Sequence, residues 1–173
     1  MSDTNLFKIR DIEGFSPQIG RLVSMMNYVR FTTLSAVQGL STEQLDYLPD
    51  ENSNSIGALL LHIAAVELGF QIEIFDGRKP NETEVAKWGA AYGLGEQARK
   101  EVKGKPLEFY IEEMTAVRNG TLAEFKERQD DWLTIERQWD GNPSNNHFIW
   151  FHVFEDEINH RGQIRILRKR LPF

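Results

Sequence analysis

Two side chains that could bind a metal, Asp156 and His160, stand four residues apart near the end of the chain. Apolar residues recur around them with the period of a helix, about 3.6 residues per turn. The predicted stripe on this helix consists of Ile149, Val153, Asp156, His160, Ile164, Leu167 and Leu171. Because burying an unpaired carboxylate costs several kcal/mol, both polar groups need a partner. They could form a structural polar layer, or they could share a divalent ion, since side chains one helical turn apart lie close together.

Other polar residues flank this stripe. His152 lies one turn before Asp156, near the edge of the stripe, and Gln163 lies just beyond His160. Each could contact a metal ligand, although Gln163 could equally be an amide at the edge of the core. Glu155 and Glu157 point about 100° to either side, so we expect them to be solvated. Asp156 is therefore the favoured acidic ligand, with Glu155 as the alternative.

A further histidine, His62, lies beside the apolar seam of the segment IGALLLHIAAVELGF. In a helical bundle the second and fourth helices can face each other across the interior. His62 would then join Asp156 and His160 as a set of three ligands with open positions, which is typical of a catalytic metal site. A lone histidine on an apolar face is more often a satisfied core residue. Glu67, on the same helix, could support the site through a hydrogen bond, but we expect a solvated acid.

Helical periodicity predicts four long amphipathic helices, over residues 17 to about 38, about 55–75, 107 to about 130, and about 145 to near the end. Ser41 with Gln44 is a capping-box pattern for a short helical turn, and Ser144 or Asn145 could cap the last helix. The segment WLTIERQW alternates only weakly, so a pair of strands is a minor alternative. The chain therefore reads as all-α, an up-and-down-type four-helix bundle in one domain over residues 1–173.

Residues 76–105 are rich in glycine and charge, and they form the predicted long crossover between the second and third long helices. A weak helical pattern near residues 85–92 predicts one short helix inside it. Trp88 and Tyr92 in this segment could line a substrate entrance or simply anchor the crossover.

Composition excludes several classes of function. The chain of 173 residues has no cysteine, so it can form neither disulfides nor thiolate metal sites. Its formal net charge of -6 is the wrong sign for a domain that neutralises nucleic-acid phosphates. The first residues, MSDTNLFKIRDIEG, lack the apolar run of a signal peptide, and the most apolar stretch is interrupted by His62 and Glu67 and looks too short to span a bilayer. We expect a cytoplasmic protein without membrane or nucleic-acid partners.

The stretches LLLHIAAVE and HVFEDEINHRGQIRILRKRL resemble the DinB/YfiT-like superfamily, a bacterial group of four-helix bundles regarded as metal-dependent enzymes. The resemblance covers most of the chain in helix order and length. It implies three metal ligands, His62, Asp156 and His160. Many members carry a histidine where this chain has Asp156, whereas the branch resembling maleylpyruvate isomerases carries an acid there.

The resemblance also implies a function. Relatives include transferases and isomerases that use low-molecular-weight thiols such as bacillithiol or mycothiol. A site of two histidines and one carboxylate suits zinc, nickel, iron or manganese. Since the chain has no cysteine, the thiol would have to arrive on a small cosubstrate. Metal-dependent hydrolysis and a non-catalytic bundle with a structural polar layer are the alternatives.

A second apolar strip on the last helix consists of Trp150, Phe151, Phe154 and Ile158. Either the crossover covers this strip or a second subunit does. Because homodimers recur among the relatives, the resemblance favours a homodimer.

Overall fold

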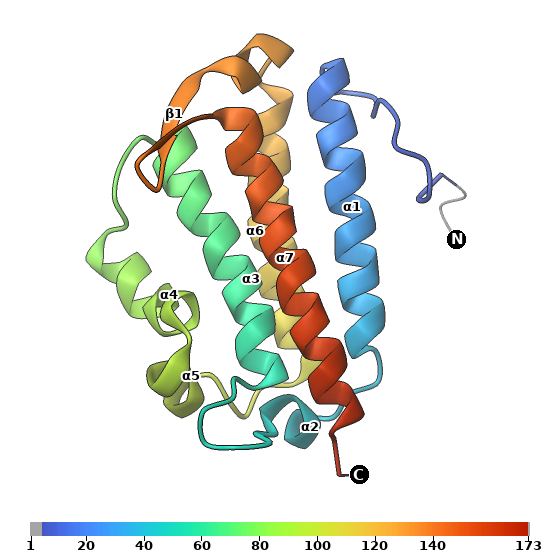
Figure 1. Ribbon diagram of the computed structural model, residues 1–173, viewed down its shortest axis with the longest axis vertical. Helices are drawn as coiled ribbons and strands as arrows, with labels where there is room; N and C mark the ends of the chain where they lie inside the picture. The colour runs from blue at the N-terminus through green and yellow to red at the C-terminus, as the bar shows by residue number, and fades with distance from the viewer. Residues whose placement is uncertain (1–4, 173) are drawn as a thin grey trace.

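The computed structural model describes residues 5–172, which are mostly helical, as predicted (Figure 1). The helices are α1 (Pro17–Val37), α2 (Thr42–Asp46), α3 (Ile56–Phe70), which continues as the π-helical turn η1 (Gln71–Phe75), α4 (Glu82–Gly93), α5 (Gly95–Glu101), α6 (Leu107–Lys126) and α7 (Asn146–Lys169). Between α6 and α7 lie a 3-10 turn, η2 (Asp130–Thr134), and two short strands, β1 (Glu136–Trp139) and β2 (Asn142–Asn145).

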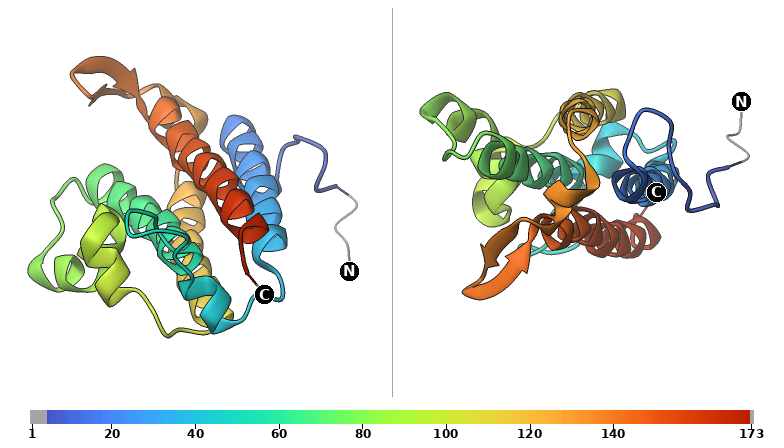
Figure 2. Two further views of the ribbon diagram at one scale, coloured as in Figure 1. Left: turned by 60° about the horizontal axis from the view of Figure 1, so that its bottom comes forward. Right: turned by 90° about the horizontal axis from the view of Figure 1, so that it is seen from above.

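The four long helices α1, α3, α6 and α7 lie side by side (Figures 1 and 2). Helices α1 and α7 run in one direction, and α3 and α6 run in the other. The crossover carries the chain back to the end where α3 began, so α6 runs parallel to α3. Helix α7 packs on both α1 and α3, and α3 also packs on α6. The groove between α3 and α7 therefore lies where the α1–α7 pair meets the α3–α6 pair.

Helix starts follow the capping residues in the sequence. Ser41 accepts a hydrogen bond from the Gln44 amide, and the Gln44 side chain completes the predicted capping box. Ser55 caps α3, and Asn145, one of the two predicted candidates, caps α7 by accepting from the Phe148 amide at 2.9 Å. These caps fix where α3 and α7 begin and therefore which side chains of each helix face the other.

The crossover contains two helices, whereas one was predicted. Leu94, at the junction between α4 and α5, has a φ of 53°, a conformation that side-chain-bearing residues rarely adopt. This kink ends α4, and the chain then restarts as α5, whose one buried residue is Ala98. Because α5 has so little apolar periodicity, no helix was predicted there.

The main prediction contained no strands, but the minor alternative of a strand pair is the correct one here, since β1 lies in WLTIERQW and forms an antiparallel hairpin with β2. Asp140 and Gly141 both have positive φ, at 47° and 76°, and they form its two-residue turn. An Asp-Gly pair between two short segments is a strong hairpin signal. It received little weight because apolar and polar residues alternate only weakly in the preceding segment, WLTIERQW.

Helix α3 together with η1 forms an apolar segment of 20 residues, Ile56–Phe75, which by length and composition could cross a membrane. The run of 15 residues in the sequence is thus extended by η1 into a longer apolar helix. Most of the segment is buried, however, and α4, α6 and α7 pack against α3. This is the pattern of the central helix of a bundle.

A buried ionic cluster crosses the bundle, with one residue from each long helix: Arg30, Glu67, Arg118 and Glu157. Arg118 donates to Glu67 at 2.6 Å and to Glu157 at 3.4 Å, and Arg30 donates to both acids as well. The side chains of Glu67 and Glu157 are only 1% exposed. The prediction that both are solvated acids was wrong, because two arginines compensate the two carboxylates inside the core.

The second apolar strip of α7 is divided between core and surface. Trp150 and Phe154 are buried, and Trp150 stacks on Phe75 with ring centroids 4.9 Å apart. Phe151 and Ile158 remain exposed. The bundle itself therefore covers half of this strip.

Candidate metal site

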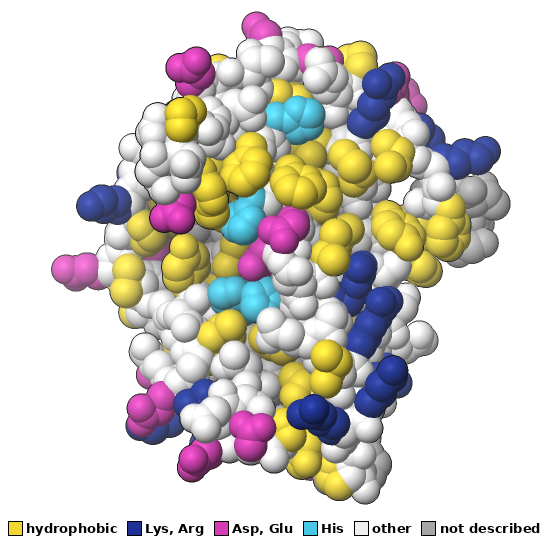
Figure 3. Space-filling model, viewed as in Figure 1, with side chains coloured by type: hydrophobic (Ala, Val, Ile, Leu, Met, Phe, Trp, Pro, Cys, Tyr) yellow, Lys and Arg dark blue, Asp and Glu magenta, His cyan; other side chains and the backbone are white. Residues whose placement is uncertain are grey.

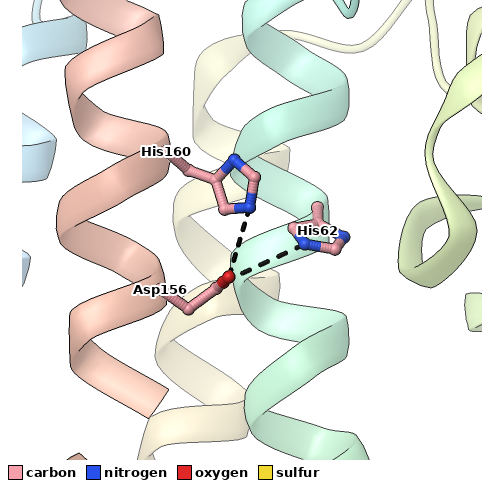
Figure 4. Close-up of side chains that lie close together, drawn as sticks. All are labelled: His62, Asp156 and His160. Atoms are coloured by element: carbon pink, nitrogen blue, oxygen red, sulfur yellow. Dashed lines mark ion pairs between the residues drawn. The ribbon is translucent and has the colours of Figure 1, made fainter. Parts of the chain in front are cut away.

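Three side chains from two helices meet in the groove between α3 and α7 (Figure 4). His62 comes from α3, and Asp156 and His160 come from successive turns of α7. One ligand atom from each residue lies within 4.8 Å of the other two. The His160 Nε2 atom is 3.3 Å from Asp156 Oδ1, and the His62 Nε2 atom is 3.9 Å from Asp156 Oδ2. Spacing on α7 predicted the Asp156 and His160 pair, and the packing of α3 on α7 adds His62.

The hydrogen bonding of these residues is incomplete in a way that fits a bound cation. Asp156 Oδ2 and His160 Nδ1 are buried, and neither has a hydrogen-bond partner among residues 5–172. A buried polar atom without a partner costs about 1–3 kcal/mol. A divalent ion beside the carboxylate would compensate this cost for Asp156 Oδ2, whereas His160 Nδ1 lies on the side of the ring that is turned away from Asp156. Two nitrogens with one oxygen form a donor set that zinc and similar metals accept.

The hydrogen bonding and protonation of His62 also suit a metal ligand. Its Nδ1 atom lies 2.9 Å from the carbonyl oxygen of Ala91 on α4, so Nδ1 carries the proton and Nε2 is left as the free donor. Burial lowers the pKa of His62, which keeps the imidazole neutral. A ligand histidine whose other nitrogen donates to a backbone carbonyl is the usual arrangement in metal sites. No feature of the sequence pointed to Ala91, because the contact depends on how the crossover folds back.

The neighbouring polar residues have other partners. Glu155, the alternative acidic ligand, accepts from His152 Nδ1 at 3.0 Å and from Asn159 at 2.6 Å, so Asp156 is the acid that faces both histidines. His152 is held within an aromatic group that includes Trp139, whose ring centroid is 4.5 Å away. Gln163 is exposed, and its side chain makes no hydrogen bond within residues 5–172. Glu67 belongs to the ionic cluster of the core.

The site is open on one side. The side chains of His62, Asp156 and His160 are 11%, 20% and 12% exposed. Figure 3 shows histidine and acidic side chains at the surface on this face, surrounded by hydrophobic side chains. A small molecule could therefore reach the three donors, as a catalytic site requires and a buried structural layer does not.

Comparisons with known proteins place the chain in a family and support its fold. The family model described as Mycothiol-S-transferase matches residues 21–172. Among solved structures, the chain is similar to a conserved protein from Enterococcus faecalis, with 15% sequence identity, coverage of 86% of this chain and 93% of that chain, and a TM-score of 0.64. At this identity the structural likeness concerns the fold. No curated protein matches the sequence.

Proposed function

The chain belongs to the mycothiol S-transferase family, a DinB-like family, and from this premise we propose that it is a metal-dependent enzyme that joins a small thiol to an electrophile. In this proposal the whole chain forms one DinB-like domain, and its substrate is a small-molecule thiol. The printed name of the family makes mycothiol the first thiol to test.

One observation carries the metal part of the proposal. Ligand atoms of His62, Asp156 and His160 lie within 4.8 Å of one another, while Asp156 Oδ2 is buried and has no hydrogen-bond partner in the described part of the chain. Zinc, nickel, iron and manganese all accept such donors. The metal, when bound, supplies a positive charge that stabilises the thiolate form of a thiol.

The residues of the chain do the remaining work. His62 is kept neutral by burial and oriented by the Ala91 carbonyl, so its Nε2 lone pair faces the site. Asp156 brings one negative charge, which leaves a divalent site with net positive charge for an anionic sulfur. In the reaction, the thiol proton passes to solvent and a sulfur lone pair forms the bond to carbon. The leaving group departs with the electron pair of the broken bond.

Two further proposals concern the cellular location and the oligomeric state of the protein. We propose a cytoplasmic protein, in keeping with a family of soluble enzymes. We also propose a homodimer, in which a second subunit covers Phe151 and Ile158, the part of the α7 strip that the bundle leaves exposed.

Metal content and thiol transfer test the proposal together. Protein purified without a metal-chelating tag should contain about one divalent ion per chain. Asp156→Ala and His160→Ala should lose the ion and at least about 100-fold of the transfer rate from mycothiol to 1-chloro-2,4-dinitrobenzene. His147→Ala, which removes an exposed histidine outside the site, is the matched control and should change neither quantity. Transfer that persists in metal-free Asp156→Ala would contradict the proposal.

A further inference from the structure

A large cavity runs along the outer face of α3, and nothing in the proposed metal site accounts for it. Its volume is about 860 Å³, which is within the range of small-molecule sites. Helix α3, η1 and α4 form its walls, and Arg137 of β1 contributes to the lining. Aromatic side chains at this wall, Phe70, Trp88 and Tyr92, provide surfaces on which a flat apolar group could pack.

One end of this cavity adjoins the candidate metal site. Tyr92 lines the cavity, and its ring centroid is 6.5 Å from that of His62. Ala65, another lining residue, lies one turn after His62 on α3. From Ala65 to Ile72 the lining follows α3 and η1 for about 10 Å. A ligand of that length would have one end beside the metal ligands and the other end at η1.

At the far end of the cavity, two carboxylates compensate the charge of one arginine. Arg78 donates to both oxygens of Glu84 at 2.7 Å, and it also pairs with Asp76 at 3.1 Å. Neither Arg78 nor Glu84 therefore presents an uncompensated charge to a ligand, and the two residues close the wall between η1 and α4.

Two other cations of the lining have no carboxylate partner within residues 5–172. The Arg137 Nε atom donates to Asn146 Oδ1 at 2.7 Å, which fixes the side chain and leaves both terminal amino groups for a ligand. Lys79 makes no side-chain hydrogen bond or ion pair in that range. Glu73 is the one lining acid that is unpaired there. Among the lining charges that have no partner in that range, two cations therefore accompany one acid.

We infer that this cavity binds the electrophilic cosubstrate and selects an organic anion, whose apolar body packs on Trp88 and Tyr92 while its carboxylate or sulfonate lies at Arg137 and Lys79. Paired terminal amino groups of an arginine suit a planar carboxylate. The electrophilic carbon would then lie at the Tyr92 end, beside His62. The identity of the ligand as a cosubstrate rests on the proposed function, but the binding itself does not.

Dye binding tests the cavity without turnover. The probes are 1-anilinonaphthalene-8-sulfonate and the uncharged N-phenyl-1-naphthylamine, which share an aromatic body and differ in the sulfonate. We expect the anionic dye to bind at one site per chain, and Arg137→Gln to weaken it by about fivefold or more while the neutral dye changes by less than about twofold. Trp88→Ala should weaken both dyes. Arg165→Gln, at an exposed arginine of α7, is the control and should affect neither.

Two further measurements separate this inference from the proposed function. Arg137→Lys keeps the charge and should restore part of the affinity for the anionic dye, which a purely structural role of Arg137 would not produce. In transfer from mycothiol, 4-chloro-3,5-dinitrobenzoate and its methyl ester form the same carbon–sulfur bond and release chloride. The preference in kcat/KM for the acid over the ester should fall by about fivefold or more in Arg137→Gln.

The outcomes are distinct for the two ideas. Dye binding that follows these expectations in metal-free His160→Ala would support the cavity even if no transfer occurs. Anionic dye that binds no tighter than the neutral dye, or that is indifferent to Arg137→Gln and Trp88→Ala, would overturn the inference even if the protein is an active metal-dependent transferase.

Discussion

The buried ionic cluster makes a quantitative prediction for Glu67→Gln. Glutamine keeps the shape of the side chain but removes its negative charge, so the cluster changes from neutral to one excess positive charge. In the native protein, Glu67 Oε1 accepts from Arg118 and from Thr121, each at 2.6 Å, and Oε2 accepts from Arg30 at 3.3 Å. Its side chain is 1% exposed, so water cannot replace the lost charge.

The expected loss in the free energy of unfolding follows from this burial. Removing one partner of a buried ion pair costs about 3–5 kcal/mol, because the remaining charge is left uncompensated. Two guanidinium groups would then depend on Glu157 alone. The Glu67→Gln and Arg118→Met double variant should cost less than the sum of the two single variants by at least about 1 kcal/mol, because the double variant restores neutrality.

Urea unfolding followed by far-ultraviolet circular dichroism at pH 7 measures this cost. A loss of about 4 kcal/mol corresponds to a midpoint lower by about 2 M urea. Glu112→Gln is the matched control, at an exposed acid of α6 that has no ion pair among the described residues, and should shift stability by less than about 0.5 kcal/mol. A loss below about 1 kcal/mol for Glu67→Gln, or strict additivity in the double variant, would refute the electrostatic account.

The same cluster fixes the sign of a pH dependence. Burial alone would raise the pKa of Glu67, but Arg118 and Arg30 outweigh it and hold the pKa below its ordinary value. The folded state therefore binds this proton more weakly than the unfolded state. The stability due to Glu67 is present above the unfolded pKa, about 4.3, and is lost as pH falls through the folded pKa. The advantage of the wild type over Glu67→Gln should shrink accordingly in acid.

Three further predictions concern glycines and the metal. Gly162→Ala should raise the free energy of unfolding by about 0.5–1 kcal/mol, because a Cβ atom there meets nothing within 4 Å. Gly57→Ala should lower it by about 1–3 kcal/mol, because that Cβ would lie 2.6 Å from the buried Tyr110 hydroxyl; thermal unfolding measures both. Dialysis against a chelator should remove about 2.7 kcal/mol relative to protein with zinc at 100 times its dissociation constant, and Asp156→Ala should show no such difference.

The sequence was informative where local chemistry decides the structure. Caps at Ser41, Ser55 and Asn145 carry their own hydrogen-bond acceptors, so the starts of three helices follow from short motifs. The meeting of Asp156 and His160 follows from the helical period alone.

The structural features that were not predicted from the sequence depend on contacts between residues far apart in the chain. An acid such as Glu157 beside an apolar stripe is usually solvated, and its burial depends on Arg30, which is 127 residues away in the chain. The His62 contact with Ala91 depends on the fold of the crossover, which has little periodicity. Both features need the positions of several elements at once, and a local pattern contains no such information.

Neighbouring acids on α7 explain how a polar core and an open site can coexist. Asp156 and Glu157 differ by about 100° around the helix, so Glu157 can point into the bundle while Asp156 faces the groove. Helix α3 divides its polar residues in the same way, with Glu67 in the ionic cluster and His62 in the groove. Rotating either helix about its axis would break strong bonds in the core before it moved the ligands far. The ionic cluster therefore fixes the rotation of the two helices whose relative orientation the candidate metal site requires.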